Sequence, residues 1–234
     1  MNWDYSLYYA PLHPDTPEHW RMMDERMRRW LGPHLPADRT ARVLDFGCGH
    51  GYALRTLQGL SFSRIEGLDA DAGQVAYARA HGLPVAQVAD SLAWLGARTG
   101  QFDLVLLLDV LEHVPRADQP GLLVALADSL RAGGRLILTV PNAAASLAGY
   151  WRYGDYTHHA SFTPASLDFL LRQTGWTAPR CYEIELAPPG WGARALVQRA
   201  LRAWRRLEFQ AEFGRRQGRL VPVTPNLLAV AERA

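Results

Sequence analysis

The chain has 234 residues, enough for one α/β domain with an appendage but too few for two full domains. A hydrophobic fraction of 48% and a charged fraction of 21% exclude extensive disorder, and a net charge of +2 is too small to indicate nucleic acid. The two cysteines, Cys48 and Cys181, exclude a disulfide framework and fit a reducing, cytoplasmic setting. We expect a soluble protein, which could still lie at the inner face of a membrane.

The first 40 residues form an N-terminal unit of their own in this interpretation. Residues 1–16 are rich in aromatics and prolines, among them Tyr8 and Tyr9, so a regular helix is excluded and the aromatic rings need a surface to lie on. Two interpretations stay open, namely packing against the domain and a lid over a ligand. A helix then follows from Thr16 to about Leu31, where Gly32 and Pro33 end it.

Strands and helices alternate between residues 41 and 142. We predict strands near 42–46, 64–68, 84–88, 103–108 and 134–140, with helices near 50–60, 71–81 and 117–131. Such alternation implies a parallel sheet with helices on both faces, because right-handed crossovers place them there. The run 102–108 is apolar at nearly every position, as expected for a strand that is buried on both faces.

The pattern lapses after Asn142 and resumes at Thr163. We predict an insertion over 141–163, a helix over 164–174, a strand near 180–186, an arginine-rich helix over 192–213 and a last strand over 224–231. Residues 41–234 are therefore expected to form one domain with a Rossmann-like, doubly wound sheet. That sheet would have seven mostly parallel strands, the last of them antiparallel.

The glycine-rich stretch from Val43 to Gly51 predicts a strand that turns sharply into a helix around a ligand. Its alternate glycines allow close approach of a ligand, and the helix start offers unpaired N–H groups. A dinucleotide fingerprint, a phosphate-binding loop and the cofactor loop of a methyltransferase all have this form. A Walker loop is excluded because the chain contains no lysine.

Acidic residues follow four successive predicted strands, at the sheet edge where α/β proteins bind ligands. They are Asp45, Asp69, Asp90 with Ser91, and Asp109. Asp69 lies twenty-four residues after Asp45, near the ~20 expected of a carboxylate that binds ribose hydroxyls. Asp45 and Asp109 place negative charge beside the loop, which disfavours a pyrophosphate. The site suits a cationic ligand such as S-adenosylmethionine, which carries ammonium and sulfonium groups.

Five motifs in order resemble those of class I S-adenosylmethionine-dependent methyltransferases, most closely the branch with the ubiquinone-biosynthesis O-methyltransferases. They are VLDFGCGHG from Val43, GLD from Gly67, Asp90-Ser91, FDLVLLLDVLEHV from Phe102 and LRAGGRLILTVPN from Leu130. The resemblance implies S-adenosyl-L-methionine as cofactor and S-adenosyl-L-homocysteine as product. It assigns the methionine moiety to Asp45, Phe46, Gly47, Cys48, Gly49 and Gly51, the ribose to Asp69 and Ala70, the adenine to Asp90 and Ser91, and the methyl side to Asp109 and Val110.

A second resemblance lies outside this core. The segments around Asn2 to Tyr9, His19 to Arg21 and Tyr153 to Leu167 are similar to methyltransferases of bacterial surface-polysaccharide synthesis. It implies an O-methyltransferase whose acceptor is a sugar or glycan, bound by Tyr8, Tyr9, Asn142, Tyr153, Tyr156 and His159. An acidic residue is usual in that pattern where this chain has His159.

Two alternatives to a sugar methyltransferase stay open. One is an O-methyltransferase of a small aromatic or quinone-like metabolite, and the other is a non-catalytic, cofactor-binding partner subunit. A nucleic-acid substrate is disfavoured, because no motif for a flipped base appears. The oligomeric state is not predicted.

Methyl transfer to a hydroxyl needs a base to remove the proton. His158 is the first candidate, because the insertion must cross the ligand edge and Asp155 could orient its ring. His113, four residues after Asp109, is the second, although it could equally be a histidine bonded to a neighbouring loop. No metal is predicted, since Asp155 is the one acidic residue near 141–163.

The helix over 192–213 is amphipathic and cationic, with Val197, Leu201 and Trp204 on one stripe and Arg199, Arg202 and Arg206 on another. The simpler interpretation places the apolar stripe on the core or on a partner subunit. The alternative is peripheral association with a membrane, in which the arginines attract anionic lipid or a lipid-linked glycan.

Overall fold

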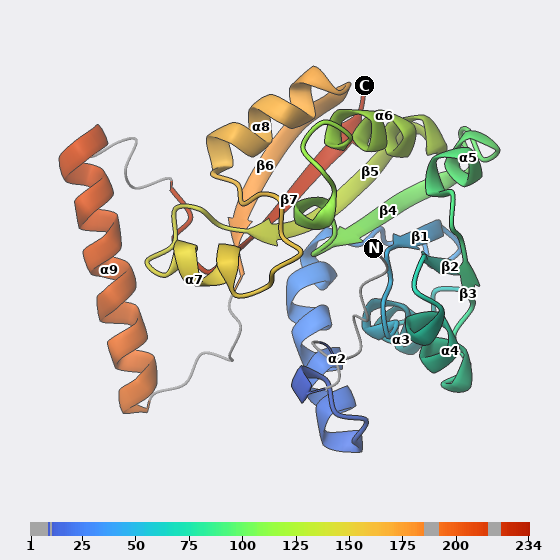
Figure 1. The fold of residues 1–234 in the computed structure, drawn as a ribbon, viewed down its shortest axis with the longest axis horizontal. Coiled ribbons are helices and arrows are strands. Elements are labelled where there is room, and N and C mark those ends of the chain that lie inside the picture. The colour runs from blue at the N-terminus through green and yellow to red at the C-terminus, as the bar shows by residue number, and fades with distance from the viewer. Residues whose placement is uncertain (1–8, 10, 185–191, 215–220) are drawn as a thin grey trace.

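The structure is a computed structural model that describes residues 9, 11–184, 192–214 and 221–234. Its strands form one seven-stranded sheet in the order β3-β2-β1-β4-β5-β7-β6 (Figure 1). The strands are β1 (Arg42–Phe46), β2 (Arg64–Asp69), β3 (Val85–Gln87), β4 (Phe102–Leu108), β5 (Leu130–Pro141), β6 (Trp176–Glu183) and β7 (Asn226–Arg233). Strands β1 to β5 are parallel, and β7 runs antiparallel between β5 and β6. The predicted fold class is confirmed.

The centre of the sheet is the point where the strand order reverses. Strand β1 pairs in parallel with both β2 and β4, so that Asp45 stands opposite Gly67 on one side and Leu106 on the other. The carboxyl ends of these strands therefore meet at one edge, where open α/β sheets bind ligands.

Helices cover both faces of the sheet (Figure 1). The helices are α2 (Pro17–Leu31), α3 (Tyr52–Gly59), α4 (Ala72–Ala80), α5 (Ser91–Gly96), α6 (Gln119–Ser129), α7 (Ala148–Tyr153), α8 (Pro164–Gln173) and α9 (Ala193–Phe213), with 3₁₀ turns η1 (Gly32–His34) and η2 (Leu111–His113). Buried side chains of α2 and α3 pack on one face, and those of α5, α6 and α8 pack on the other. None of the described helices combines the length and apolar character that crossing a membrane requires.

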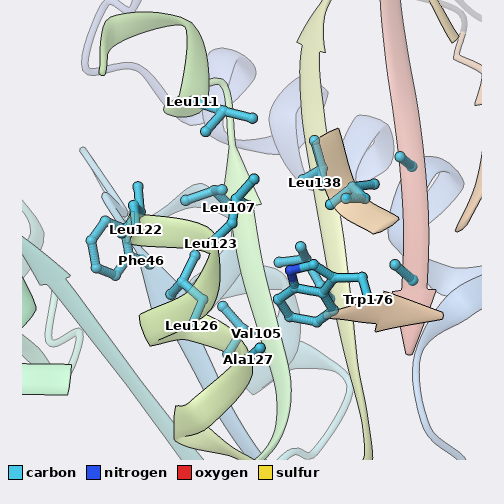
Figure 2. Close-up of a cluster of buried hydrophobic side chains, with 14 of the residues drawn as sticks. Phe46, Val105, Leu107, Leu111, Leu122, Leu123, Leu126, Ala127, Leu138 and Trp176 are labelled. Carbon is cyan, nitrogen blue, oxygen red and sulfur yellow. The ribbon is translucent and has the colours of Figure 1, made fainter. Parts of the chain in front are cut away.

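The larger core lies between the sheet and the helices α6 and α8. Leu122, Leu123 and Leu126 of α6 reach onto Val105 and Leu107 of β4, as Figure 2 shows. Trp176, at the start of β6, is one of the largest fully buried side chains and extends this core toward the sheet edge. The core thus fixes the central strands, whose carboxyl ends carry the site.

The sequence prediction missed helices α5 and α7. Helix α5 has only six residues, too few for apolar periodicity to show, and begins where the Asp90 carboxylate accepts a hydrogen bond from Ala93 N at 2.9 Å. His113 ends the short turn η2, and α6 begins at Gln119, close to the predicted start at 117. Strand β6 starts four residues earlier than predicted, at Trp176.

Candidate active site

The glycine loop after β1 has the conformation that its sequence demands. Gly47, Gly49 and Gly51 have φ values of +70°, +53° and +81°, in the left-handed region that favours glycine. A Cβ on Gly47 would lie 2.6 Å from Val110 Cγ2, and one on Gly51 would lie 2.4 Å from Leu83 Cδ1. Neither position of the loop can therefore accommodate a side chain. The loop leads directly into α3.

Two carboxyl groups lie at this loop, and both are partly or fully withdrawn from water. Asp69 accepts hydrogen bonds from Gly49 N and Asp71 N, each at 2.9 Å, so that it holds the loop against β2. Asp45 is buried, and burial together with the charge of Asp69 raises its pKa to about 7. Two neighbouring carboxyls that resist ionising together favour a cationic ligand, which fits S-adenosylmethionine better than a pyrophosphate.

Asp109 marks the opposite side of the loop. Its Oδ1 accepts hydrogen bonds from Thr139 Oγ1 at 2.9 Å and from Asn226 Nδ2 at 3.0 Å, and its φ of +53° is unusual for a residue with a side chain. Its neighbour Val110 packs against Gly47. Strands β1, β4, β5 and β7 thus all contribute to one edge.

The other predicted cofactor residues extend along the same edge. Cys48 is half-buried against Gly67, Ala70 is exposed after β2, and Asp90 caps α5 with Ser91 beside it. Phe46 instead points into the large core below the loop (Figure 2). Its side chain therefore supports the loop from beneath.

Tyr9 lies against the glycine loop. Its hydroxyl is 3.4 Å from the place that a Cβ on Gly49 would take, and its ring stacks on His13 and contacts the edge of His50. Burial and the nearby charges of Tyr52, Asp109, Asp69 and Asp45 raise its pKa. We predicted an acceptor contact for Tyr9, and the structure places its ring beside the glycine loop, near Asp109, Asp69 and Asp45. Tyr8 lies outside the described residues.

The insertion after β5 brings a polar chain of residues to η2. His113 Nδ1 lies 2.8 Å from Thr157 Oγ1, and Thr157 Oγ1 donates to Asp155 Oδ1 at 2.6 Å. Thr157 donates its only hydroxyl proton to Asp155. Its oxygen therefore accepts the hydrogen bond that His113 Nδ1–H donates. This tautomer leaves His113 Nε2 as the basic nitrogen.

His158 stands beside His113, with 4.7 Å between the ring centroids. Its Nδ1 donates to Trp151 O at 3.1 Å, since a carbonyl can only accept, and its Nε2 is again the basic nitrogen. Asp155 Oδ2 lies 4.0 Å from that Nε2, too far for a hydrogen bond. Asp155 therefore orients His113 through Thr157, which differs from the expectation that it orients His158.

Burial sets the charge state of this cluster. Burial lowers the pKa of His113 to about 4, and the neighbouring His158 lowers it in the same direction. Burial also lowers the pKa of His158, although the charges of Asp155 and Asp109 act to raise it. Both rings are neutral at pH 7 and can accept a proton. The charge of Asp109 acts on His158, so the histidine cluster and the methyl side of the loop are neighbours.

Glu112 is a buried acid that sequence reasoning missed. Its carboxyl is almost fully buried, its Oε2 has no hydrogen-bond partner among the described residues, and burial raises its pKa well above the usual range. One carboxylate oxygen of Glu112 and one ring nitrogen each of His113 and His158 lie within 4.8 Å of one another. This spacing would also admit a metal ion. The signal was present in the sequence, since Glu112 directly precedes His113.

Asn142 is the clearest departure among the predicted acceptor residues. It is fully buried, its Nδ2 donates to Pro222 O and Thr224 O, and its Oδ1 accepts from Ala144 N. These contacts make it a structural residue that ties β5 to the segment before β7. Sequence reasoning could not foresee this, because its partners lie some eighty residues downstream.

The remaining acceptor residues lie on the insertion. Tyr153 and Tyr156 are exposed by 78% and 85%. His159 is exposed too, while its backbone N–H donates to Glu112 O at 2.6 Å and fastens the insertion to η2. The insertion therefore carries exposed tyrosines beside a half-buried histidine cluster.

The sheet order, the glycine loop and the row of carboxylates define the class I methyltransferase fold. A family model described as a methyltransferase domain matches residues 19–178, more than half of the chain. The chain therefore belongs to the methyltransferase domain family, as predicted.

Two relatives carry the name ubiquinone biosynthesis O-methyltransferase. The protein from Marinobacter nauticus is 30% identical over 60% of this chain, and the match spans 57% of its own length. The protein from Xanthomonas axonopodis pv. citri is 33% identical over 74% of each chain. A solved S-adenosylmethionine-dependent methyltransferase from Archaeoglobus fulgidus has a TM-score of 0.70 at 17% identity, over 98% of this chain and all of its own. The likeness to the solved structure shows that the two chains share their fold.

Proposed function

We propose that the chain is an S-adenosylmethionine-dependent O-methyltransferase in which His113 and His158 deprotonate the acceptor hydroxyl. The observation that carries the proposal is the pair of neutral imidazoles beside Asp109, each held through its Nδ1 by a hydrogen bond, so that Nε2 is the basic nitrogen of each ring. Methyl transfer to oxygen needs such a base next to the donor's methyl group.

The loop residues would hold the cofactor by charge and shape. Asp45 and Asp109 would contact its cationic end and Asp69 its ribose, and the glycines of the loop would permit backbone contact. When bound, S-adenosylmethionine supplies an electrophilic methyl group on sulfur and leaves as S-adenosylhomocysteine. The remaining steps belong to residues of this chain.

His113 is the better oriented of the two bases. As the acceptor oxygen bonds to the methyl carbon, His113 Nε2 takes the hydroxyl proton while Nδ1–H remains bonded to Thr157. The carboxylate of Asp155 behind Thr157 stabilises the imidazolium that forms. His158 contacts the same space and can bind the hydroxyl or exchange its proton.

For the acceptor we propose a sugar hydroxyl, as in glycan or surface-polysaccharide biosynthesis. The exposed Tyr153 and Tyr156 could stack on a sugar ring, and the polar cluster behind them could bind its hydroxyls. The second candidate is a phenolic or quinol hydroxyl, which the printed names of the relatives favour. A phenol, with a pKa of about 10, would also suit imidazoles of lowered pKa better than an alcohol does.

One assay separates these candidates. The full chain is given labelled S-adenosylmethionine with either nucleotide sugars and glycans or catechols and hydroquinols, and methylated products are identified by mass spectrometry. Product from the sugar panel alone supports the sugar proposal, whereas product from the phenol panel alone replaces it. Binding of S-adenosylhomocysteine without product from either panel would favour the non-catalytic subunit.

A further inference from the structure

Helix α9 turns its apolar side to solvent. None of its described residues is buried, and Figure 1 shows it at the left edge, outside the layers that cover the sheet. Trp204 and Leu201 are exposed by 64% and 58%, and the large apolar side chains on the same side are exposed as well, namely Leu196, Val197 and Leu207. The interpretation in which this stripe packs on the chain's own core is therefore wrong.

The cationic side of α9 faces the body of the protein. Arg206 Nη2 donates to Glu183 Oε2 at the end of β6, and Arg205 Nε donates to Ala144 O in the insertion at 3.3 Å. Arg202, Arg205 and Arg206 are half-buried by these surroundings, in contrast to the exposed apolar stripe. A surface helix normally has the reverse orientation, with its apolar stripe inward.

The exposed stripe is long enough to serve as a contact surface. From Leu196 to Leu207 it extends over about 16 Å of helix, at ~1.5 Å per residue. A contiguous apolar patch of this kind, unlike scattered apolar residues, marks a site of interaction. We consider two partners for this surface, a second copy of this chain and a membrane.

The charge of the helix decides between these partners. Helix α9 contains five arginines and two glutamates, and Arg215, Arg216 and Arg219 follow it in the sequence. Arg194 is exposed on the same side as the stripe, three residues before Val197, so two stripes placed face to face would bring these like charges together, whereas anionic lipid attracts each of them. Trp204 at the middle of the stripe suits the boundary between headgroups and acyl chains.

We propose that α9 binds the surface of an anionic membrane, with the stripe Leu196, Val197, Leu201, Trp204 and Leu207 in the interfacial region. The arginine side keeps its contacts with Glu183 and Ala144, so that α9 holds the methyltransferase domain at the membrane. This proposal goes beyond the proposed function and uses none of the residues assigned to cofactor or acceptor.

The test is sedimentation of the full chain with two kinds of vesicle, phosphatidylcholine alone and phosphatidylcholine with phosphatidylglycerol. The variant Val197→Ser, Leu201→Ser, Trp204→Ser removes the stripe. A matched variant, Leu92→Ser, Val124→Ser, Phe169→Ser, removes three exposed apolar residues of α5, α6 and α8 instead. Light scattering of all three proteins without lipid reports the oligomeric state.

We expect wild type and the matched variant to sediment with anionic vesicles, and the α9 variant to lose at least tenfold in partitioning. Salt and the absence of phosphatidylglycerol should weaken wild-type binding. Wild-type protein left in the supernatant, or equal binding by the α9 variant, would overturn the proposal. A wild-type dimer that the α9 variant dissociates would assign the stripe to a second copy and overturn it too. Neither readout depends on methyl transfer.

Discussion

Asp45 shows how a buried carboxyl at the proposed cofactor site carries a stability cost. It lies at the end of β1 with only 2% of its surface exposed, and its pKa is raised to about 7 by burial and by Asp69. A carboxyl whose pKa is raised on folding binds its proton more tightly in the folded state. The folded state therefore loses stability as the pH rises from about 4 toward 7.

We predict that Asp45→Asn removes this loss. At pH 8 the variant should exceed wild type in free energy of unfolding, by up to about 4 kcal/mol for a shift of this size, and the advantage should shrink toward pH 5. Urea denaturation of both proteins at pH 5, 6, 7 and 8 measures the difference. A pH-independent difference between the two would show that Asp45 ionises normally.

The histidine pair gives a second prediction at the scale of single residues. Removing the proposed base by His113→Ala should lower kcat by about 10²-fold or more. Because the pKa of His113 is lowered to about 4, the acid limb of the wild-type profile should fall well below pH 6.5. Measured kcat values from pH 4 to 8 test both statements.

Thr157 provides the control for this role. Thr157→Val breaks the hydrogen bond to His113 Nδ1 and leaves the ring without its orienting partner, whereas Thr157→Ser keeps the hydroxyl. We expect the valine variant to lose kcat with little change in KM, and the serine variant to recover it. An unchanged kcat in Thr157→Val would remove His113 from the mechanism.

At the scale of elements, the junction of β1 and α3 depends on backbone freedom and on contact with the end of β4. Gly47 and Gly82 have nearly the same φ, +70° and +73°, but a Cβ would collide with Val110 at Gly47 and meet nothing within 4 Å at Gly82. The two positions therefore separate conformational strain from steric overlap.

We predict that Gly47→Ala costs more stability than Gly82→Ala. Both lose about 1–2 kcal/mol to the left-handed backbone, and Gly47→Ala loses about 1–3 kcal/mol more to overpacking. Urea denaturation measures both, and adding Val110→Ala should relieve the extra loss at Gly47 alone. Equal losses for the two glycine variants would show that the loop moves away from Val110 freely.

At the scale of the whole molecule, two tryptophans contrast the core with the exposed appendage. Trp176 is 2% exposed in the main core, and its Nε1 has no hydrogen-bond partner in the part of the chain that the structure describes, whereas Trp204 is 64% exposed on α9. The last strands and α9 are neighbours in the chain, yet only the strands belong to the packed body.

We predict that Trp176→Ala lowers the free energy of unfolding by about 3–5 kcal/mol, while Trp204→Ala changes it by less than about 0.5 kcal/mol. Trp176→Phe should cost less than Trp176→Ala, because the phenyl ring fills most of the cavity that alanine would leave. Chemical denaturation followed by circular dichroism measures all three. A large loss from Trp204→Ala would mean that α9 packs on the body through its apolar side.

The sequence alone determined the sheet, its handed crossovers and the cofactor edge. These features follow from local patterns, namely apolar runs, glycines that permit a left-handed turn, and acidic residues at the ends of parallel strands. Asp45, Asp69 and Asp109 could be placed because strands that run in parallel deliver their ends to one edge.

Only the tertiary structure decided how distant residues combine. It made Asn142 a structural tie to the segment before β7, joined Asp155 to His113 through Thr157, and buried Glu112 without a partner for its Oε2. It also turned the arginines of α9 inward and its apolar stripe outward. Such contacts depend on how irregular segments pack across the fold. The periodicity of a segment shows which of its sides is apolar, but not which side the neighbouring elements will cover.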